Sequence, residues 1–237
     1  MDRARRQLLK ASLAAGLVAS VPAFAAGRFE RTSARTRSGR ILGSRNGELL
    51  VFRGIPYGAD TAPRRFQPAL QEAPWRGVRD ALAYAASAPQ NGEEGPGSED
   101  CLFLNVWTPG LRDGARRPIL FYIHGGGYNN GSGSSPLYDG GNLCRRGDVV
   151  VVTVNHRLNA FGYLFLAELG GSELEYSGNV GQLDLVQALQ WVQQHAHEFG
   201  GDPGNVTVFG QSGGGAKIAT LMAMPAAAGL FHRAMTM

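Results

Sequence analysis

The chain has 237 residues, of which 43% are hydrophobic and 18% are charged. This composition is typical of a globular domain and excludes an intrinsically disordered chain. The formal net charge is +4, and residues 1–10 carry +3 of it. The rest of the chain is nearly neutral, so its charge gives no reason to expect a nucleic-acid partner.

Residues 1–26 are predicted to be a signal peptide. They begin with basic residues, continue through an Ala/Leu/Val stretch and end with Ala23-Phe24-Ala25, an A-x-A cleavage signal. The pair Arg5-Arg6 resembles the twin-arginine export signal of bacteria, and a Sec signal with incidental arginines is the alternative. The apolar stretch is too short for a retained transmembrane helix. We therefore expect export to the periplasm or the medium, with no stable membrane insertion after cleavage.

Residues 27–237 are predicted to form one domain, because no linker or internal repeat divides them. Cys101 and Cys144 are the only cysteines of the chain. In an exported protein they could form one disulfide, and two unrelated buried thiols are the alternative. Neither lies in a metal-type cluster, so we expect no metal site.

The first part of this domain is expected to combine strands with a long irregular connection. Residues 27–47 are polar and indicate a surface strand or loop, and residues 48–58 indicate a strand that ends at proline and glycine. Residues 59–97 contain five prolines, which favours a meandering connection with one helical turn near residues 80–86. Residues 102–107 indicate a further strand.

From residue 118 the pattern changes to buried strands that alternate with helices. Residues 118–124 and 148–155 are continuous apolar runs, as in strands buried within a parallel sheet. Residues 181–199 repeat apolar side chains near a 3.6-residue spacing and predict a helix that ends at two glycines. Residues 206–209 indicate a third buried strand. The alternation predicts an α/β fold with a mostly parallel central sheet flanked by helices.

The third strand leads into Gly210-Gln211-Ser212-Gly213-Gly214, which fits the pattern G-x-S-x-G. The pattern alone is weak in a chain with 34 glycines. A strand before it and a helix after it are the context in which such a serine stands on a sharp turn as a nucleophile. Ala216 stands where a phosphate-binding loop needs lysine, which excludes that reading. We predict that Ser212 is a catalytic nucleophile.

A second motif, His124-Gly125-Gly126-Gly127, directly follows a predicted buried strand. Acyl transfer needs N–H donors aimed at the oxygen that becomes negative, and glycines let the backbone approach it. Lipase and esterase oxyanion loops have this sequence in this position. A plain glycine-rich loop is the alternative, and the presence of the serine turn favours the oxyanion loop.

Several longer segments resemble the type-B carboxylesterase/cholinesterase family, from about residue 36 to the last residue. They are Phe52–Tyr57, Ser98–Pro109, Asn155–Leu164, Gly178–Asp184, Ala188–Val192 and Phe199–Pro203. The resemblance implies an α/β-hydrolase fold, incomplete at its C-terminal side, and hydrolysis of a small-molecule carboxylic ester through an acyl-serine. It makes Ser212 the nucleophile and the N–H groups of Gly126, Gly127 and Gly213 the oxyanion hole. It implies no metal and no organic cofactor.

The resemblance also implies two ion pairs, Arg53 with Glu99 and Arg157 with Asp184. Cys101 matches a position that is disulfide-bonded in some members, but the upstream segment that would hold its partner contains no cysteine.

Four positions differ from the family pattern. Gln211 and Gly213 stand where a glutamate and an alanine are usual, and His156 and Asn159 replace a tyrosine and a glycine. The loss of a carboxylate beside the serine argues against a cationic choline ester. We interpret His156 and Asn159 as packing or turn variants.

The acid and histidine of this family follow the serine in that order. Only 25 residues follow Ser212, and His232 among them belongs to a family segment for which a structural role is expected. Because a serine needs a base to be activated, we expect the chain as given to be inactive, with an apolar sheet edge exposed after the middle strands. A truncated or degraded non-catalytic product, a cholinesterase-like binding domain, and a half that works with a separately encoded partner are the alternatives.

Overall fold

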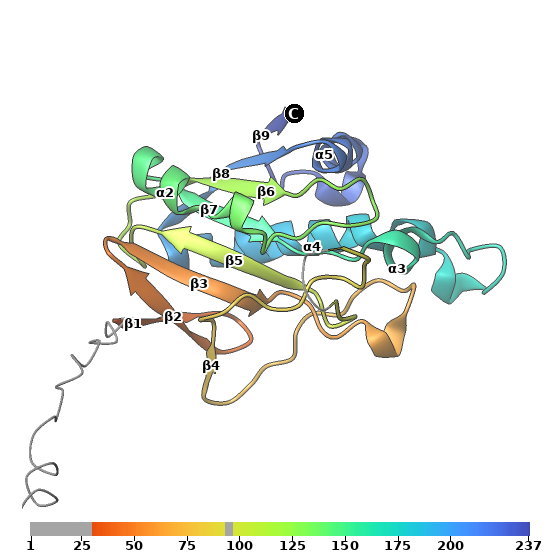
Figure 1. The fold of residues 1–237 in the computed structure, drawn as a ribbon, viewed down its shortest axis with the longest axis horizontal. Helices are drawn as coiled ribbons and strands as arrows, with labels where there is room; N and C mark the ends of the chain where they lie inside the picture. Colours follow the sequence, from red (N-terminus) through yellow and green to blue (C-terminus); the bar gives the residue numbers. More distant parts are fainter. Residues whose placement is uncertain (1–29, 93–96) are drawn as a thin grey trace, which may run out of the picture.

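The computed structural model describes residues 30–92 and 97–237, and within them nine strands form one sheet (Figure 1). The strand order is β1-β2-β3-β5-β7-β6-β8-β9, and β4 pairs with β2. The strands are β1 Arg31–Arg35, β2 Arg40–Asn46, β3 Leu49–Pro56, β4 Val78–Asp80, β5 Phe103–Thr108, β6 Arg117–Ile123, β7 Val150–Val154, β8 Gly201–Gly210 and β9 Arg233–Thr236. The predicted signal peptide, residues 1–26, lies outside the described residues.

The sheet is mixed. The neighbours from β1 to β7 along the order run antiparallel, whereas β7, β6, β8 and β9 run parallel to one another. The parallel part contains the apolar runs predicted as buried strands, and all five residues of β7 are buried. The two-residue connection between β2 and β3 permits only antiparallel pairing, because a parallel neighbour needs a long crossover. The predicted α/β fold is confirmed, but the sheet is mixed and not mostly parallel, because β1, β2, β3, β5 and β7 pair antiparallel in turn. The consecutive parallel pairs join β7, β6, β8 and β9, and β4 pairs parallel with β2.

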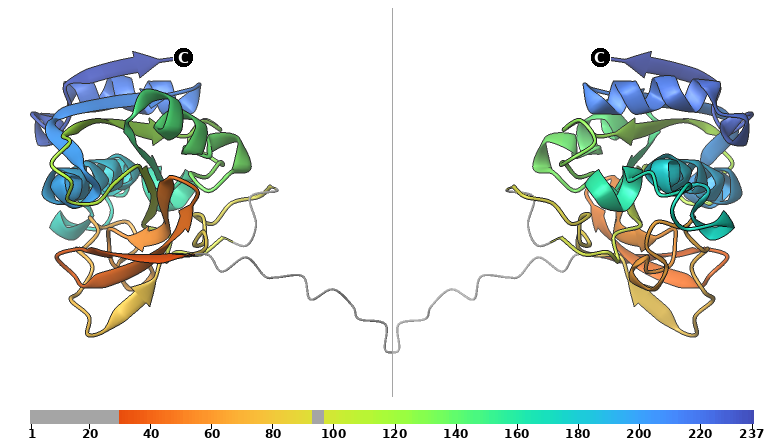
Figure 2. Two further views of the ribbon diagram at one scale, coloured as in Figure 1. Left: turned by 90° about the vertical axis from the view of Figure 1, so that its left-hand side faces the viewer. Right: turned by 90° about the vertical axis from the view of Figure 1, so that its right-hand side faces the viewer.

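Helices cover both faces of the sheet. α4 (Val180–His195) and α5 (Gly213–Ala223) pack on one face, and α2 (Gly141–Gly147) packs on the other. The two views of Figure 2 show α2 and α4 on opposite sides of the strands. The remaining helical segments are η1 Ala62–Arg64, η2 Pro136–Tyr138, α3 Asn159–Tyr163, η3 Ser172–Leu174, η4 Ser177–Asn179, η5 Ala196–Phe199 and η6 Pro225–Ala227. None of the helices in the described residues is long and apolar enough to cross a membrane.

The larger core lies between the sheet and α4 with α5. On β6, Ile119, Phe121 and Ile123 belong to this core, whereas Leu120 packs with the smaller cluster under α2. This alternation is the period of two expected of a strand. In the parallel register Ile123 lies opposite Gly210. The segments that follow β6 and β8 therefore start side by side at one edge of the sheet.

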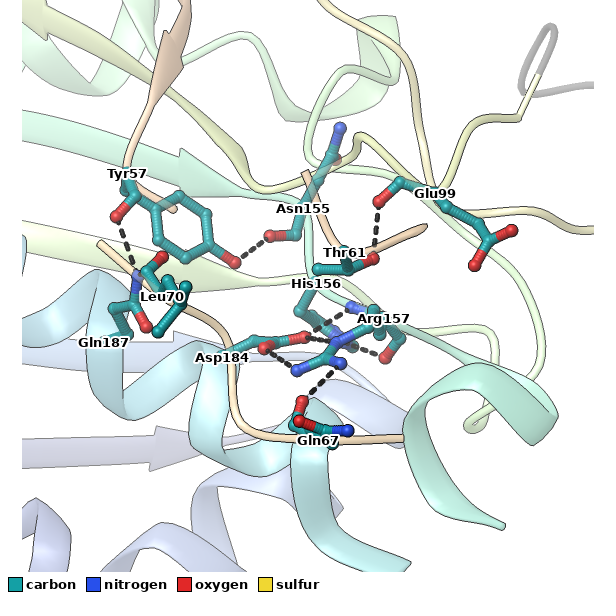
Figure 3. A network of polar contacts seen from close by, with 10 residues as sticks. All are labelled: Tyr57, Thr61, Gln67, Leu70, Glu99, Asn155, His156, Arg157, Asp184 and Gln187. Atoms are coloured by element: carbon teal, nitrogen blue, oxygen red, sulfur yellow. Dashed lines mark hydrogen bonds and ion pairs between the residues drawn. The ribbon is translucent and has the colours of Figure 1, made fainter. Parts of the chain in front are cut away.

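A buried ion pair joins the segment after β7 to α4, as the family resemblance implies (Figure 3). Arg157 Nη2 lies 2.7 Å from Asp184 Oδ1, and Arg157 Nε lies 2.8 Å from Asp184 Oδ2. The backbone N–H of Arg157 donates to the same carboxylate at 3.0 Å, and Nη1 donates to the Gln67 carbonyl at 2.8 Å. All three guanidinium nitrogens and both carboxylate oxygens are thus hydrogen-bonded, which favours tolerance of a buried pair.

The other implied pair, Arg53 with Glu99, is wrong. Arg53 pairs with Asp139 at 3.5 Å and lies over the ring of Tyr84. Glu99 instead binds the guanidinium of Arg65, with 2.7 Å between Arg65 Nε and Glu99 Oε2. Arg65, the residue after η1, occupies Glu99, and Arg53 pairs with Asp139, the residue after η2.

The helical turn predicted near residues 80–86 is also wrong, because sheet hydrogen bonds engage the backbone at its start. The Ala81 N–H donates to the Leu42 carbonyl at 2.7 Å, and the Ala81 carbonyl accepts from Arg53 N at 2.8 Å. Leu82 forms an isolated bridge to Arg53.

Cys101 and Cys144 are both buried and both free. Cys101 belongs to the core under α4, and Cys144 belongs to the cluster under α2. Because the sheet separates these two clusters, the predicted alternative of two unrelated thiols is the one that the structure shows.

Candidate active site

Ser212 stands on the turn between β8 and α5, with a φ of 54° and a ψ of −119°. A positive φ is unfavourable for a residue with a side chain and persists only where the surroundings enforce it. The Ser212 N–H donates to the Met237 carbonyl at 2.7 Å, and the Ser212 carbonyl accepts from Ala216 N at 3.1 Å. The residue itself is exposed. The turn therefore presents the hydroxyl at the surface on a fixed backbone.

Glycines surround Ser212 because the turn lies against the end of β6. A Cβ added to Gly210 would stand 2.6 Å from the Ile123 carbonyl oxygen, and one added to Gly214 would overlap the same oxygen. Side chains at these two positions would push the turn away from β6. The spacing of G-x-S-x-G thus follows from the contact between the two segments.

The structure brings the predicted oxyanion residues together at this turn. Gly126 and Gly127 have positive φ values of 87° and 62°. A Cβ added to Gly213 would overlap the Gly127 carbonyl oxygen, and one added to Gly125 would lie 3.5 Å from Ser212 Cβ. In the described part of the chain no hydrogen bond uses the N–H of Gly126, Gly127 or Gly213. All three donors are available beside the serine.

Two side chains that the sequence analysis did not single out hold the far end of this glycine loop. Gln90 Oε1 accepts from Gly131 N at 2.7 Å, and Asn155 Oδ1 accepts from Gly133 N at 2.8 Å. A lone glutamine after a proline and an asparagine after a strand carry no motif. Only the fold brings them to the loop.

In the described residues no histidine is hydrogen-bonded to Ser212. His124 and His156 are buried and stacked with their ring centroids 4.8 Å apart. Burial lowers the pKa of His124 to about 4 and the pKa of His156 well below 6.5. His195 Nε2 accepts from Arg37 N, and His232 Nδ1 accepts from Val206 N.

Across residues 30–92 and 97–237, no hydrogen bond joins the Ser212 side chain to a histidine or a carboxylate. The stacking of His156 on His124, and a left-handed φ of 47° at Asn159, agree with their interpretation as packing and turn variants.

Lys217 is a third polar residue at the site that the sequence analysis did not single out. It lies on α5 with no exposed surface, and its Nζ lies 2.5 Å from the Gly127 carbonyl oxygen. Its rarity could have drawn attention to it, since Lys10 is the only other lysine of the chain.

The arrangement suits nucleophilic attack by Ser212 on a carbonyl carbon. The oxygen of that carbonyl becomes negative as the bond forms, and N–H groups beside the serine are the kind of donor that stabilises it. The N-terminus of α5, directly after Ser212, adds the positive end of a helix dipole. In the described residues no cluster of three or more His, Cys, Asp or Glu side chains could hold a metal ion.

A cavity of about 650 Å³ opens next to the glycine loop. Its lining includes Asn129 and Asn130 of this loop, together with Asn159 and Phe161. Ser212 is not among the lining residues. The cavity thus borders the oxyanion segment, not the serine itself.

Comparison with known proteins agrees with this geometry. The model of a family described as "Carboxylesterase family" matches residues 30–237. Para-nitrobenzyl esterase of Bacillus subtilis is 43% identical over 208 residues, which cover 84% of this chain and 42% of that protein. Phenmedipham hydrolase of Pseudarthrobacter oxydans is 44% identical over 216 residues, which cover 86% of this chain and 42% of that protein. The chain therefore spans less than half the length of the curated relatives it matches.

Solved structures show the same partial coverage. Carboxylesterase EST55 of Geobacillus stearothermophilus superposes with a TM-score of 0.83 at 47% identity, covering 87% of this chain and 43% of that structure. An esterase of Clostridium hathewayi superposes with a TM-score of 0.82 at 44% identity and covers 44% of that structure.

Proposed function

Because this chain belongs to the carboxylesterase family, we propose that it supplies the nucleophile and the oxyanion hole of a serine carboxylesterase. The observation that carries the proposal is the position of Ser212. It stands on a strained turn, exposed, at the N-terminus of α5, and the free N–H groups of the glycine loop lie beside it. Family membership and this geometry support the same reaction.

In the proposed reaction Ser212 Oγ attacks the carbonyl carbon of a carboxylic ester. The carbonyl oxygen becomes an oxyanion and accepts hydrogen bonds from Gly126, Gly127 and Gly213. Collapse of this intermediate expels the alcohol and leaves an acyl-serine, which water then hydrolyses to release the acid and restore the hydroxyl. A base must take the Ser212 proton and return it to the leaving alcohol.

We propose that this base and its acid partner lie outside the described residues. In α/β-hydrolases both follow the serine in the chain, and no histidine of residues 30–92 and 97–237 is bonded to Ser212. The 237-residue chain is therefore expected to turn over esters no faster than its Ser212→Ala variant. The alternative is that the chain has a purely non-catalytic role, and the experiment must distinguish this role from that of one part of an esterase.

Uncharged esters are the substrates that the site favours. Gln211, beside the nucleophile, replaces the usual carboxylate, so a cationic alcohol group finds no negative charge there. The names of the relatives, para-nitrobenzyl esterase and phenmedipham hydrolase, support a small-molecule substrate.

A hybrid protein tests the proposal. Residues 30–237 replace the matching segment of the Bacillus subtilis para-nitrobenzyl esterase. By the chain order of α/β-hydrolases, the remaining chain of that esterase is expected to supply the base and acid. We expect this hybrid to hydrolyse para-nitrophenyl acetate, and Ser212→Ala to lower the rate on the order of 10⁴-fold or more. Ser172→Ala, at an exposed serine of η3, is the matched control and should leave the rate unchanged.

Two results would contradict the proposal. One is a folded hybrid whose activity survives Ser212→Ala. The other is a hybrid with native circular dichroism and a cooperative unfolding transition that hydrolyses no ester.

A further inference from the structure

Lys217 binds the two backbone segments that border Ser212. Its Nζ donates to the Gly127 carbonyl at 2.5 Å and to the Gly213 carbonyl at 3.4 Å. The ammonium also lies 4.7 Å from the centre of the Tyr128 ring. Gly127 belongs to the loop after β6, whereas Gly213 is the first residue of α5. One side chain thus joins the loop to the helix.

A cation in this position is costly. Lys217 has no exposed surface, and none of the salt bridges among the described residues involves it. Burial lowers its pKa to about 8. The groups that face it are His124 after β6, His156 after β7 and Tyr128 in the loop, with Tyr163 of α3 behind the Tyr128 ring. None of them is an acid that would compensate the charge at neutral pH, so the carbonyl contacts must offset the desolvation.

The Gly127 backbone needs an external restraint. Gly127 belongs to no strand or helix and has a φ of 62°. A glycine also explores more backbone conformations than any other residue. The hydrogen bond from Lys217 fixes the plane of the peptide that joins Gly127 to Tyr128. The hydrogen bond to the Gly213 carbonyl fixes the distance between this peptide and the first peptide of α5.

We propose that Lys217 is a positioning residue of the oxyanion hole. Its ammonium ties the Gly127 carbonyl to the Gly213 carbonyl and so fixes the N–H groups of Gly127 and Gly213 relative to each other. The claim that these N–H groups serve an oxyanion hole rests on the proposed function. The tie itself is a property of the folded chain, and it can be measured without ester hydrolysis.

A role for Lys217 as the base that activates Ser212 has no support in the geometry. No hydrogen bond joins Lys217 to Ser212 in the part of the chain that the structure describes. The hydrogen bonds of Nζ are made to backbone carbonyls.

The sequence allows the Gly127 carbonyl to be observed selectively. Gly-Tyr occurs only twice in the chain, at Gly127-Tyr128 and at Gly162-Tyr163. Labelling glycine with ¹³C at the carbonyl and tyrosine with ¹⁵N therefore leaves two signals in a carbonyl–nitrogen correlation spectrum of the full 237-residue chain. The Gly162 signal, on α3, is an internal reference, because no hydrogen bond from Lys217 reaches that carbonyl.

We expect Lys217→Met to move the Gly127 carbonyl resonance upfield, as a carbonyl does when it loses a donor, and to leave the Gly162 resonance in place. Lys217→Arg, which keeps a charged donor, should restore the shift. Thr220→Val, at an exposed residue of the same helix, should change neither signal. The Asn130 amide, bonded to the Gly126 carbonyl, should exchange roughly tenfold faster in Lys217→Met, because the loop loses a hydrogen bond from a charged donor.

A pH titration of the unsubstituted chain needs no variant. The Gly127 resonance should move upfield as the pH rises through about 8, where Lys217 loses its proton. The two facing histidines are already neutral there. If the Gly127 carbonyl resonance moves neither during the pH titration nor in Lys217→Met, the positioning role is wrong. An inactive hybrid in which both responses occur would instead count against the proposed function and leave the tie standing.

Discussion

At the scale of single residues, contact between backbones determines which side chains the serine turn allows. Gly210 and Gly214 both face the carbonyl of Ile123, and Gly213 faces that of Gly127. Ser212, like Gln211 before it, is exposed, whereas Gly213, Gly214 and Gly215 are buried. The turn can be tested by its stability, independently of catalysis.

We expect Gly214→Ala to destabilise the fold by about 1–3 kcal/mol, because its new methyl group would overlap the Ile123 carbonyl oxygen. Gly215→Ala is the matched control on the same helix, since its methyl group would meet nothing closer than 3.3 Å. Urea unfolding followed by circular dichroism measures both. Equal stabilities of the two variants would show that Gly214 is not packed against β6.

The residues that the sequence could reveal are those with a motif. Ser212 and the glycines after His124 were predicted because their chemistry demands particular residue types at fixed spacing after a strand. Lys217, Gln90 and Asn155 have no such signature, because they act on backbone groups far away in the chain. Only the folded arrangement identifies them.

At the scale of elements, the buried pair of Arg157 and Asp184 holds α4 to the segment that leaves β7. Their side chains are 2% and 0% exposed, so neither charge can be solvated if the other is removed. This pair was predictable from family resemblance. The pair of Arg53 with Glu99, implied by the same resemblance, is wrong because Arg65 after η1 binds Glu99, and the sequence does not show that short helix.

Asp184→Asn should lower the free energy of unfolding by about 3–5 kcal/mol, since it leaves the Arg157 charge buried without its counter-charge. Glu30→Gln removes the exposed pair of Glu30 with Arg45 and should cost less than about 1 kcal/mol. Chemical denaturation of both variants gives the comparison. A loss at Asp184 no larger than the loss at Glu30 would contradict the assigned role.

Element types were predicted well where a long apolar pattern existed, as for β6, β7, β8 and α4. The segment at residues 80–86 lacks such a pattern, and its backbone joins β2 and β3 in the sheet. The antiparallel arrangement of the first strands follows from their short connections, but the polar pattern of residues 27–47 did not show where β1 and β2 begin and end.

At the scale of the whole molecule, the buried histidine stack makes stability depend on pH. The pKa of His124, lowered by burial to about 4, lies below its unfolded value near 6.5, and the pKa of His156 is lowered as well. The unfolded chain therefore binds more protons between these pH values. The free energy of unfolding should fall as the pH falls through this window, by about 1.4 kcal/mol per pH unit for each histidine that stays neutral when folded.

Urea unfolding between about pH 7 and pH 4.5 measures this slope. His156→Phe should keep the stacked packing and give a shallower slope, whereas His197→Gln, at an exposed histidine, should leave the slope unchanged. A slope that is the same in all three proteins would show that the stack does not control the acid response.

The predicted signal peptide belongs to the whole molecule but lies outside the described residues. We propose that residues 1–26 direct export through the twin-arginine route. Fused to a reporter in a bacterial host, they should deliver it to the periplasm, and replacing Arg5-Arg6 by two lysines should stop delivery. Continued delivery of that variant would favour the Sec alternative, and retention of both fusions in the cytoplasm would contradict export.

The central claim is that Ser212 is the nucleophile of an esterase site, and covalent labelling tests it most directly. The hybrid of residues 30–237 with the remainder of para-nitrobenzyl esterase is treated with a fluorophosphonate, digested and mapped by mass spectrometry. The account predicts one phosphonyl adduct, on Ser212, formed in step with the loss of ester hydrolysis. A hybrid that hydrolyses esters and is inactivated while Ser212 stays unmodified would contradict it.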